Sequence, residues 1–394
     1  MAAVVAARPL QPVLPLISLG AAIGIVELVG GFMFPAMALS LEARGASLGM
    51  IGAQAAMVGL GLMLSALLVP WLSGRLGAVR LGLVNLVLTG LAVLAFGLLD
   101  HVGWWFGLGL MLGVTANVWY VQSETWLNQL APDHSRGRTL GLVNGVREGA
   151  AACGPLLIPL LGHLGATPYA LMAAVLAAAG LLLPGLGRHV AQPAAPRLTE
   201  LLATARAMPV LLLAVAVSGY FDGAVLPFWL IYAAHQGVAT DQAALTLTLI
   251  VLGNIGLQLP IGWLADKVPA QLVLATCALG AAFGALLLPQ LDLASWLAWP
   301  FLLGWGALSF GVYTVALILI GRHLPAERLV VATATFGVAW GAGALLGSAV
   351  TGQITATFGP DGLTTSVALA YAVLIGGLAH DAAPVTIRPR TLPA

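Results

Sequence analysis

The stretch Asn117–Pro155 reads NVWYVQSETWLNQLAPDHSRGRTLGLVNGVREGAAACGP and consists of two apolar segments joined by a short basic turn. Glu124 precedes that turn by about two helical turns, and Arg147 and Glu148 follow it at a similar distance. A charge in the hydrocarbon core of a membrane costs roughly 2.5–3.5 kcal/mol even on the most lenient scale. Charges in such apolar surroundings therefore indicate a binding partner or a transport pathway.

The composition of the whole chain predicts a membrane protein. Of its 394 residues, 60% are hydrophobic and only 7% are charged, whereas soluble domains carry roughly 25% charged residues. The two cysteines, Cys153 and Cys277, fall inside apolar segments and provide no disulfide framework or zinc site. The first apolar run is too long for a cleaved signal peptide and contains Glu27.

Windows of about 20 apolar residues predict the membrane-spanning helices. Because the apolar runs are continuous and about twice as long as the strands of a membrane barrel, the expected fold class is an all-α membrane protein with twelve transmembrane helices. The predicted spans are 15–41, 50–72, 81–99, 104–130, 139–162, 167–186, 209–233, 243–265, 270–290, 296–320, 329–352 and 362–380.

The basic residues predict the orientation. If the N-terminus is cytoplasmic, 13 of the 15 Lys and Arg residues fall on the cytoplasmic side, as the positive-inside rule requires. Arg44 then lies outside and Arg147 within a span, and an even number of spans places both termini inside. The 13 are Arg8, Arg75, Arg80, Arg136, Arg138, Arg188, Arg197, Arg206, Lys267, Arg322, Arg328, Arg388 and Arg390.

The longest connection divides the chain into two similar parts. We expect an N-terminal six-helix bundle at 1–186, a cytoplasmic linker with a short amphipathic helix at 187–208, and a C-terminal six-helix bundle with a short tail at 209–394. One offset of 192 residues aligns landmarks of the two halves, which indicates an internal repeat. The aligned pairs are Pro35 with Pro227, Gly45 with Gly237, Arg75 with Lys267, Arg136 with Arg328, Gly145 with Gly337 and Gly149 with Gly341.

Acidic residues inside the spans are candidates for proton exchange. Glu27 lies near the middle of the first span and Asp222 near the middle of the seventh. Burial away from water favours the neutral form of a carboxyl group, so such a group can bind a proton in one state and release it in another. The alternative is an acid that only bonds a neighbouring helix.

The charges of the opening stretch predict an ion pair. Glu124 and Arg147 lie at matching depth in adjacent spans, and Glu148 is a competing or additional partner of the same arginine. A buried pair often contributes little net stability, so it is available for exchange with a substrate or a proton during a cycle. A fixed clamp between the fourth and fifth spans is the alternative.

The loop after the second span of each half carries a recognisable motif. The sequence GWLADKVP follows the eighth span and PWLSGRLGAVR follows the second. With twelve spans, the repeat and the central linker, these loops make the whole chain resemble the major facilitator superfamily, whose motif is Gly-x-x-x-Asp-Arg/Lys-x-Gly. The matching residues are Gly262, Asp266, Lys267, Arg75, Gly77 and Arg80, and the departures are Pro269, Pro70 and Gly74.

The resemblance implies a gate on the cytoplasmic side, formed by Arg75, Arg80, Asp266 and Lys267, in which a loop carboxylate latches the halves together. Because Gly74 replaces the acid in the first half, Asp266 is the better candidate for that latch. The alternative interpretation treats these residues as ordinary charged turns. With the latch acid missing, the group of Glu124, Arg147 and Glu148 is expected to share control of the inner gate.

The resemblance also implies that the first and fourth spans of each half line a central cavity. The candidate substrate contacts are Asn117, Trp119, Tyr120, Tyr220 and Tyr313, and aromatic rings with a polar tip suit an amphipathic organic substrate. The glycines at every fourth residue of the fifth span are similar to a motif of exporters. SETWLN in the fourth span resembles a Glu-Ser-Trp-Leu motif in a poorly characterised bacterial subgroup.

The expected function is secondary active transport of a small organic molecule by alternating access, coupled to protons, with export favoured. One alternative is proton-coupled uptake of a metabolite or of copper. Met33 and Met37 in the first span could pass along Cu(I), but without His or Cys nearby core packing is favoured. An alternative of another class is a membrane sensor that transports nothing.

The remaining expectations concern chemistry, partners and location. The sequence holds no Walker loop, metal-hydrolase motif or catalytic triad, so we expect neither an enzyme nor a cofactor. The expected partners are the substrate, protons and the lipid bilayer, without nucleic acid, and the protein is expected to be a monomer. The expected location is the bacterial cytoplasmic membrane, crossed many times.

Overall fold

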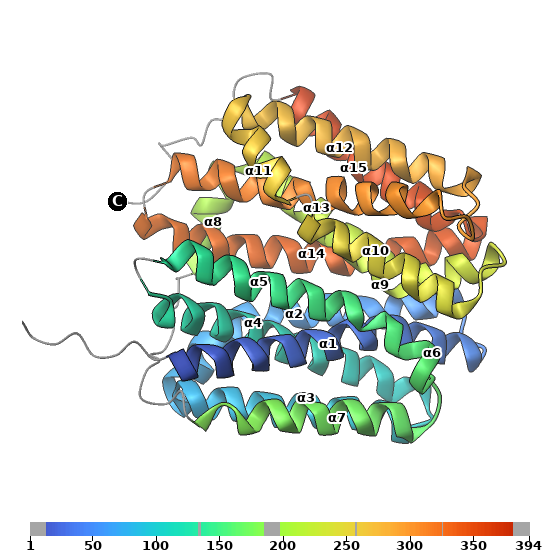
Figure 1. Ribbon diagram of the computed structural model, residues 1–394, viewed down its shortest axis with the longest axis horizontal. Coiled ribbons are helices and arrows are strands. Elements are labelled where there is room, and N and C mark those ends of the chain that lie inside the picture. Colours follow the sequence, from blue (N-terminus) through green and yellow to red (C-terminus); the bar gives the residue numbers. More distant parts are fainter. Residues whose placement is uncertain (1–12, 133–134, 185–197, 257, 325, 381–394) are drawn as a thin grey trace, which may run out of the picture.

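The computed structural model describes residues 13–132, 135–184, 198–256, 258–324 and 326–380 (Figure 1). Every element of regular structure in these ranges is helical, which confirms the predicted all-α class. The elements are α1 Val13–Ala43, α2 Leu48–Leu76, α3 Ala78–Leu98, α4 Val102–Leu130, α5 Arg136–Cys153, η2 Pro155–Leu157, α6 Ile158–Leu161, α7 Ala166–Leu181, α8 Leu198–Ala207, α9 Pro209–His235, α10 Thr240–Gly256, α11 Gln258–Lys267, α12 Ala270–Leu287, η4 Leu288–Gln290, α13 Ala298–His323, α14 Ala326–Phe358 and α15 Gly362–His380.

Some of the predictions concern other parts of the chain. The first part of the expected linker, 187–197, and the expected tail, 381–394, lie outside the described residues. So do the basic residues Arg8, Arg188, Arg197, Arg388 and Arg390. Helix α8 occupies the described part of the expected linker.

In the described ranges, ten helical segments are long and apolar enough to cross a membrane. They coincide with the predicted spans except the fifth and sixth. The predicted span 139–162 is divided into α5, η2 and α6, with prolines at the start of η2 and α6, and its first helix carries the charges of the opening stretch. The predicted span 167–186 corresponds to α7, which is apolar but only 16 residues long.

The helices lie in two groups (Figure 1). Helices α1 to α7 form one side of the molecule, here called the N-terminal half, and α9 to α15 form the other, the C-terminal half. The long helices run along a common direction. Helix α8 and the start of α1 lie at one end, which we call the linker end, and the α6–α7 and α9–α10 connections lie at the opposite end.

Helices α1 and α9 end in the same way. Gly45 and Gly237 follow them, each with a φ of 78°, a left-handed backbone conformation that glycine adopts without steric cost. Their N–H groups donate to the carbonyl oxygens of Glu42 and Ala234, at 2.8 and 3.0 Å. The offset of 192 residues therefore relates two matching helix ends.

Close helix crossings also recur in the two halves. A Cβ atom on Gly61 of α2 would lie 2.3 Å from the carbonyl oxygen of Leu110 of α4, and a Cβ on Gly253 of α10 would lie 2.3 Å from that of Leu303 of α13. Only glycine allows backbones to approach this closely. The α2–α4 crossing is thus repeated by α10 and α13.

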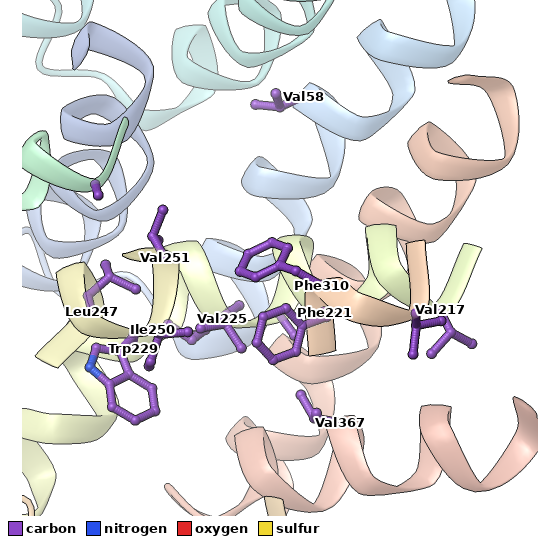
Figure 2. Close-up of a cluster of buried hydrophobic side chains, with 14 of the residues drawn as sticks. Val58, Val217, Phe221, Val225, Trp229, Leu247, Ile250, Val251, Phe310 and Val367 are labelled. Carbon is purple, nitrogen blue, oxygen red and sulfur yellow. The ribbon is translucent and has the colours of Figure 1, made fainter. Parts of the chain in front are cut away.

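Aromatic and branched side chains fill the C-terminal half around α9 (Figure 2). Phe221 of α9 packs edge-to-face on Phe310 of α13, with ring centroids 5.4 Å apart. Trp229 lies about two helical turns further along α9 and is fully buried. Its indole nitrogen donates a hydrogen bond to the Thr246 hydroxyl of α10 at 2.9 Å. This packing joins α9 to α10 and α13, and α9 carries Asp222.

Candidate functional site

Arg147 of α5 is the centre of the charged group inside the helices. Its guanidinium forms an ion pair and a hydrogen bond with Glu124 of α4. On another side, its Nε lies 3.6 Å from a carboxylate oxygen of Glu27 of α1. Three helices of the N-terminal half therefore meet at one arginine. The predicted contact between Glu124 and Arg147 is present, and Glu27 is a second partner that the sequence did not indicate.

The arginine is more deeply buried than its two acids. Its side chain is 8% exposed, whereas those of Glu27 and Glu124 are 28% and 29% exposed. A buried guanidinium must be paired, because removal from water is costly for an unpaired charge. The two carboxylates, in contrast, keep part of their surface exposed.

Polar and aromatic neighbours complete the environment of Arg147. The Ser123 hydroxyl and the Asn144 side-chain oxygen accept hydrogen bonds from the guanidinium at 3.4 and 3.3 Å. The guanidinium carbon also lies 5.0 Å from the centre of the Tyr120 ring, within the range of a cation–π interaction. Its Nε nevertheless has no hydrogen-bond acceptor among the described residues, so the contact with Glu27 is electrostatic.

Glu148 does not pair with Arg147, and this corrects the expectation that it competes for the same arginine. Its carboxylate instead accepts a hydrogen bond from the side-chain amide of Asn254 of α10, at 2.9 Å. Adjacent residues on a helix point about 100° apart, so Arg147 and Glu148 face different neighbours. Arg147 faces the N-terminal half, and Glu148 faces the C-terminal half.

Asp222 of α9 is the acidic residue at the middle of the C-terminal half. It is partly buried and makes no hydrogen bond or ion pair with the described part of the chain. Within the described residues, Asp222 therefore has no cation that would neutralise it.

The predicted substrate-contact residues separate into two sets. Tyr120 is 44% exposed and lies close enough to Tyr313 of α13 for their side chains to interact. Tyr313 in turn packs edge-to-face on Trp340 of α14, at 4.8 Å between ring centroids. These aromatic rings come from both halves, and the ring of Tyr120 lies beside Arg147. Trp340 was not among the predicted residues, because no motif marks it.

Asn117, Trp119 and Tyr220 occupy more structural positions in this conformation. Asn117 donates to the Leu62 carbonyl oxygen of α2 at 3.2 Å, and so ties two helices of one half together. Trp119 is only 2% exposed and packs edge-to-face on Trp126. Tyr220 is partly buried on α9, where its backbone touches that of α14. None of the three lies in the aromatic group of Tyr120.

The predicted gate residues lie at the linker end. Asp266 forms a 2.8 Å ion pair with Arg322 of α13, which also donates to the Ala265 carbonyl oxygen at 2.8 Å. Both partners belong to the C-terminal half, so the candidate latch acid is engaged within its own half. Arg75, Arg80 and Lys267 are exposed at the same end.

The two halves contact each other most closely along α2 and α14. A Cβ on Gly52 would lie 2.4 Å from the Ser348 carbonyl oxygen, and a Cβ on Gly59 would lie 2.4 Å from the Leu345 backbone nitrogen. This backbone contact, here called the glycine seam, starts near the opposite end, where α2 begins and α14 ends. It continues to the middle of the helices, where Gly341 meets Met63.

The described residues include no group of three or more His, Cys, Asp or Glu side chains that could hold a metal ion. Met33 and Met37 are buried in the core. The Met37 sulfur accepts from the Gln54 side-chain amide at 3.9 Å, which joins α1 to α2. The geometry therefore matches the core-packing interpretation of these methionines.

Comparisons with known proteins agree with this architecture. The sequence model of the Major Facilitator Superfamily matches residues 19–208 and 211–391. The chain is 24% identical over 349 residues to the uncharacterized MFS-type transporter YfkF of Bacillus subtilis (strain 168), covering 83% of this chain and 85% of that protein.

Solved structures share the fold. The nucleoside transporter NupG superposes with a TM-score of 0.77 at 12% identity, covering 93% of this chain and 98% of that one. A bacterial homolog of the human lysosomal transporter Spinster, inward-facing and occupied, gives 0.73 at 11% identity over 99% and 100%. A D-xylose-proton symporter gives 0.61 at 18% identity over 91% and 96%.

The two helical halves, their repeated crossings and the charged group inside the N-terminal half are features of a multi-span membrane protein of the transporter class. The chain belongs to the Major Facilitator Superfamily. Members of this family are transporters and not enzymes, in agreement with the expectation from sequence. At these sequence identities the solved structures establish the fold alone. They do not identify the substrate of this chain.

Proposed function

We propose that this protein is a proton-coupled secondary active transporter that exports a small amphipathic organic molecule by alternating access. The observation that carries the proposal is the group of Glu27, Glu124 and Arg147, which lies inside the helices beside the exposed ring of Tyr120. Ionisable groups within a membrane are costly and are usually retained for a pathway. Here they lie in the N-terminal half, beside Tyr120, whose side chain interacts with Tyr313 of the C-terminal half.

The chemistry follows from the charges. Glu27, Glu124, Glu148 and Asp222 carry four negative charges when ionised, and Arg147 carries the single positive charge of the group. Low-dielectric surroundings cannot hold three excess negative charges, so protons or a substrate must neutralise part of the group. When one acid binds a proton, Arg147 loses a partner and can turn to another. Such exchange can link proton binding to rearrangement of the helices.

The proposed topology has twelve spans with both termini inside the cell, including the interrupted segment α5–η2–α6 and the short α7. Support comes from the described basic residues, most of which gather at the linker end, while Arg44 lies at the opposite end. We therefore assign the linker end to the cytoplasm of a bacterial cell and the surrounding bilayer to its cytoplasmic membrane. The linker-end residues are Arg75, Arg80, Arg136, Arg138, Arg206, Lys267 and Arg322.

The proposed domains are two six-helix bundles, 1–186 and 209–394, joined by the linker 187–208, in a monomer. The glycine seam closes the bundles at the opposite end, and Asp266 pairs inside its own half instead of latching the two. Both features support an inward-facing state. The bundles rock about the charged group to reach the alternate state.

The substrate class follows from the aromatic group. Tyr120, Tyr313 and Trp340 offer flat apolar faces with polar tips, which suit an organic molecule with an aromatic or apolar part. Export is favoured by the similarity of the glycine pattern in α5 to that of exporters. In the present conformation Gly141 and Gly145 have open space around them, so they leave room for the helix movement that export requires.

The first prediction concerns the two acids at the middle of the halves. We expect Glu27→Gln and Asp222→Asn each to reduce proton-driven transport by at least tenfold, because an amide cannot exchange a proton. A thermal-shift screen of the purified protein against metabolites, drugs and metals first identifies a ligand. Its affinity is then measured by titration at several pH values, and its flux in proteoliposomes under a pH gradient.

The control for this prediction is Asn117→Leu, which changes a polar side chain of α4 without adding or removing a charge. It should keep the pH dependence of ligand binding even if its stability falls. Wild-type pH dependence of binding and of flux in both Glu27→Gln and Asp222→Asn would contradict the assignment of proton exchange to these acids.

A further inference from the structure

Glu27 of α1 and Glu124 of α4 share a single arginine. Glu124 forms a direct ion pair with Arg147, and a carboxylate oxygen of Glu27 lies 3.6 Å from the Nε of the same residue. When both acids are ionised, this group has one more negative charge than positive charges. The other Lys and Arg residues of the sequence lie outside the predicted spans. A second positive charge for the group therefore has to come from outside the chain.

Glu27 is held by charge alone. Its carboxylate accepts no hydrogen bond from the part of the chain that the structure describes. The Nε of Arg147, buried and without an acceptor of its own, lies beyond hydrogen-bond distance from it. Polar groups inside proteins nearly always have hydrogen-bond partners. Glu27 therefore keeps free acceptor positions that a ligand can fill.

An exposed aromatic ring lies next to these acids. The ring of Tyr120 is centred 5.0 Å from the guanidinium carbon of Arg147, so it already has a cation beside it, and its side chain is well exposed. Tyr120 also interacts with Tyr313 of the C-terminal half, which packs on Trp340. Aromatic faces attract cations and bind the ammonium groups of organic ligands. Acids of one half and aromatic rings of both halves are therefore neighbours here.

Glycines leave open space beside the same residues. Gly30 lies about one helical turn after Glu27 on α1, and Gly145 lies two residues before Arg147 on α5. A Cβ atom on either glycine would meet no atom within 4 Å. The carboxylates of Glu27 and Glu124 are themselves partly exposed. A ligand therefore has room to approach both acids.

We propose that Glu27, Glu124 and Tyr120 form a recognition site for an organic cation, in which an ammonium group is attached to an aromatic or apolar part. This inference rests on the proposed transport function and deepens it by naming the charge of the substrate. The two carboxylates attract the ammonium group, and the rings of Tyr313 and Trp340 pack on the apolar part. A cation supplies the positive charge that the group lacks, whereas an anion adds to the excess negative charge.

The experiment compares three ligands that have the same aromatic part and different charges. They are naphthylmethyltrimethylammonium, naphthylmethanol and naphthylmethanesulfonate, and the fluorescence of naphthalene reports their binding to the purified protein in an uncharged detergent. The trimethylammonium group has no proton to lose, so its charge is fixed. We expect the dissociation constant of the ammonium ion to be at least about tenfold lower than those of the alcohol and the sulfonate.

Variants separate recognition of charge from a role in folding. Glu124→Gln removes one of the two negative charges, and Glu27→Gln removes the other while it leaves the closest ion pair of Arg147 in place. Each should weaken binding of the ammonium ion at least about tenfold and change binding of the alcohol less than about twofold. The matched control is Asp100→Asn, which removes an exposed negative charge at the opposite end, where Asp100 pairs with Arg44. It should change none of the three dissociation constants by more than about twofold.

Two results would overturn the inference: an ammonium ion that binds no more tightly than the alcohol or the sulfonate, or an equal loss of ammonium and alcohol binding in both glutamine variants. Flux in proteoliposomes separates this inference from the proposed function. Proton-driven flux of a ligand, with no preference for the ammonium ion, contradicts only the assignment of a cation. Selective binding of the ammonium ion without proton-driven flux of any ligand contradicts the proposed coupling and supports the recognition site.

Discussion

Replacing Arg147 by glutamine is expected to abolish transport and to lower the free energy of unfolding by about 3–5 kcal/mol, the usual result of removing one partner of a buried ion pair. Arg147 is the common partner of Glu27 and Glu124 and is almost fully buried. Without it, two acids inside the helices face each other with no cation. Thermal unfolding monitors the stability, and solute flux in proteoliposomes monitors the transport.

A double variant distinguishes lost charge balance from lost function. Glu124→Gln combined with Arg147→Gln removes both members of the closest pair, so we expect it to recover most of the stability but none of the transport. Recovery of transport in the double variant would show that the pair is only a fixed clamp between α4 and α5. Near-normal stability of Arg147→Gln alone would show that the pair contributes little.

A single methyl group in the glycine seam should have the next largest effect. In Gly59→Ala the added Cβ would lie 2.4 Å from the Leu345 backbone nitrogen, far inside normal van der Waals contact. Backbone atoms cannot turn away as a side chain can, so α2 and α14 must separate. We expect the opposite end to stay open and transport to fall at least tenfold. The distance between spin labels at Leu164, in the α6–α7 connection, and Ala239, in the α9–α10 connection, measures the opening of that end. Flux in proteoliposomes measures the transport.

The matched control for the seam is Gly337→Ala on α14, where an added Cβ would meet no atom within 4 Å. Alanine is a better helix former than glycine by roughly 0.5–1 kcal/mol, so this variant should fold at least as well and transport normally. Normal transport in Gly59→Ala would contradict the view that the seam must close once in each cycle.

The sequence predicted most of the helices because hydropathy depends only on local composition. It did not predict the break at Pro155, since prolines are common inside membrane helices and only the structure shows which one ends α5. The offset of 192 residues was visible in the sequence. The crossings that it relates, such as those at Gly61 and Gly253, needed the paths of the backbones.

The charged site was predictable only in part. Matching depth in adjacent spans indicated the pair of Glu124 and Arg147, because depth follows from counting residues. The lateral neighbours of a helix do not follow from counting, so Glu27 was not expected beside Arg147 and Glu148 was placed with the wrong partner. Asn254 carries no charge and belongs to no motif, and therefore nothing in the sequence marks it.

The most direct test of the central claim is flux of the ligand identified by the thermal-shift screen, measured in proteoliposomes that contain only this protein. With no nucleotide present, a pH gradient alone should drive the ligand against its own concentration gradient. Adding the ligand without a pH gradient should in turn move protons across the membrane. Ligand flux that is unchanged when the pH gradient is removed or reversed would contradict proton-coupled transport.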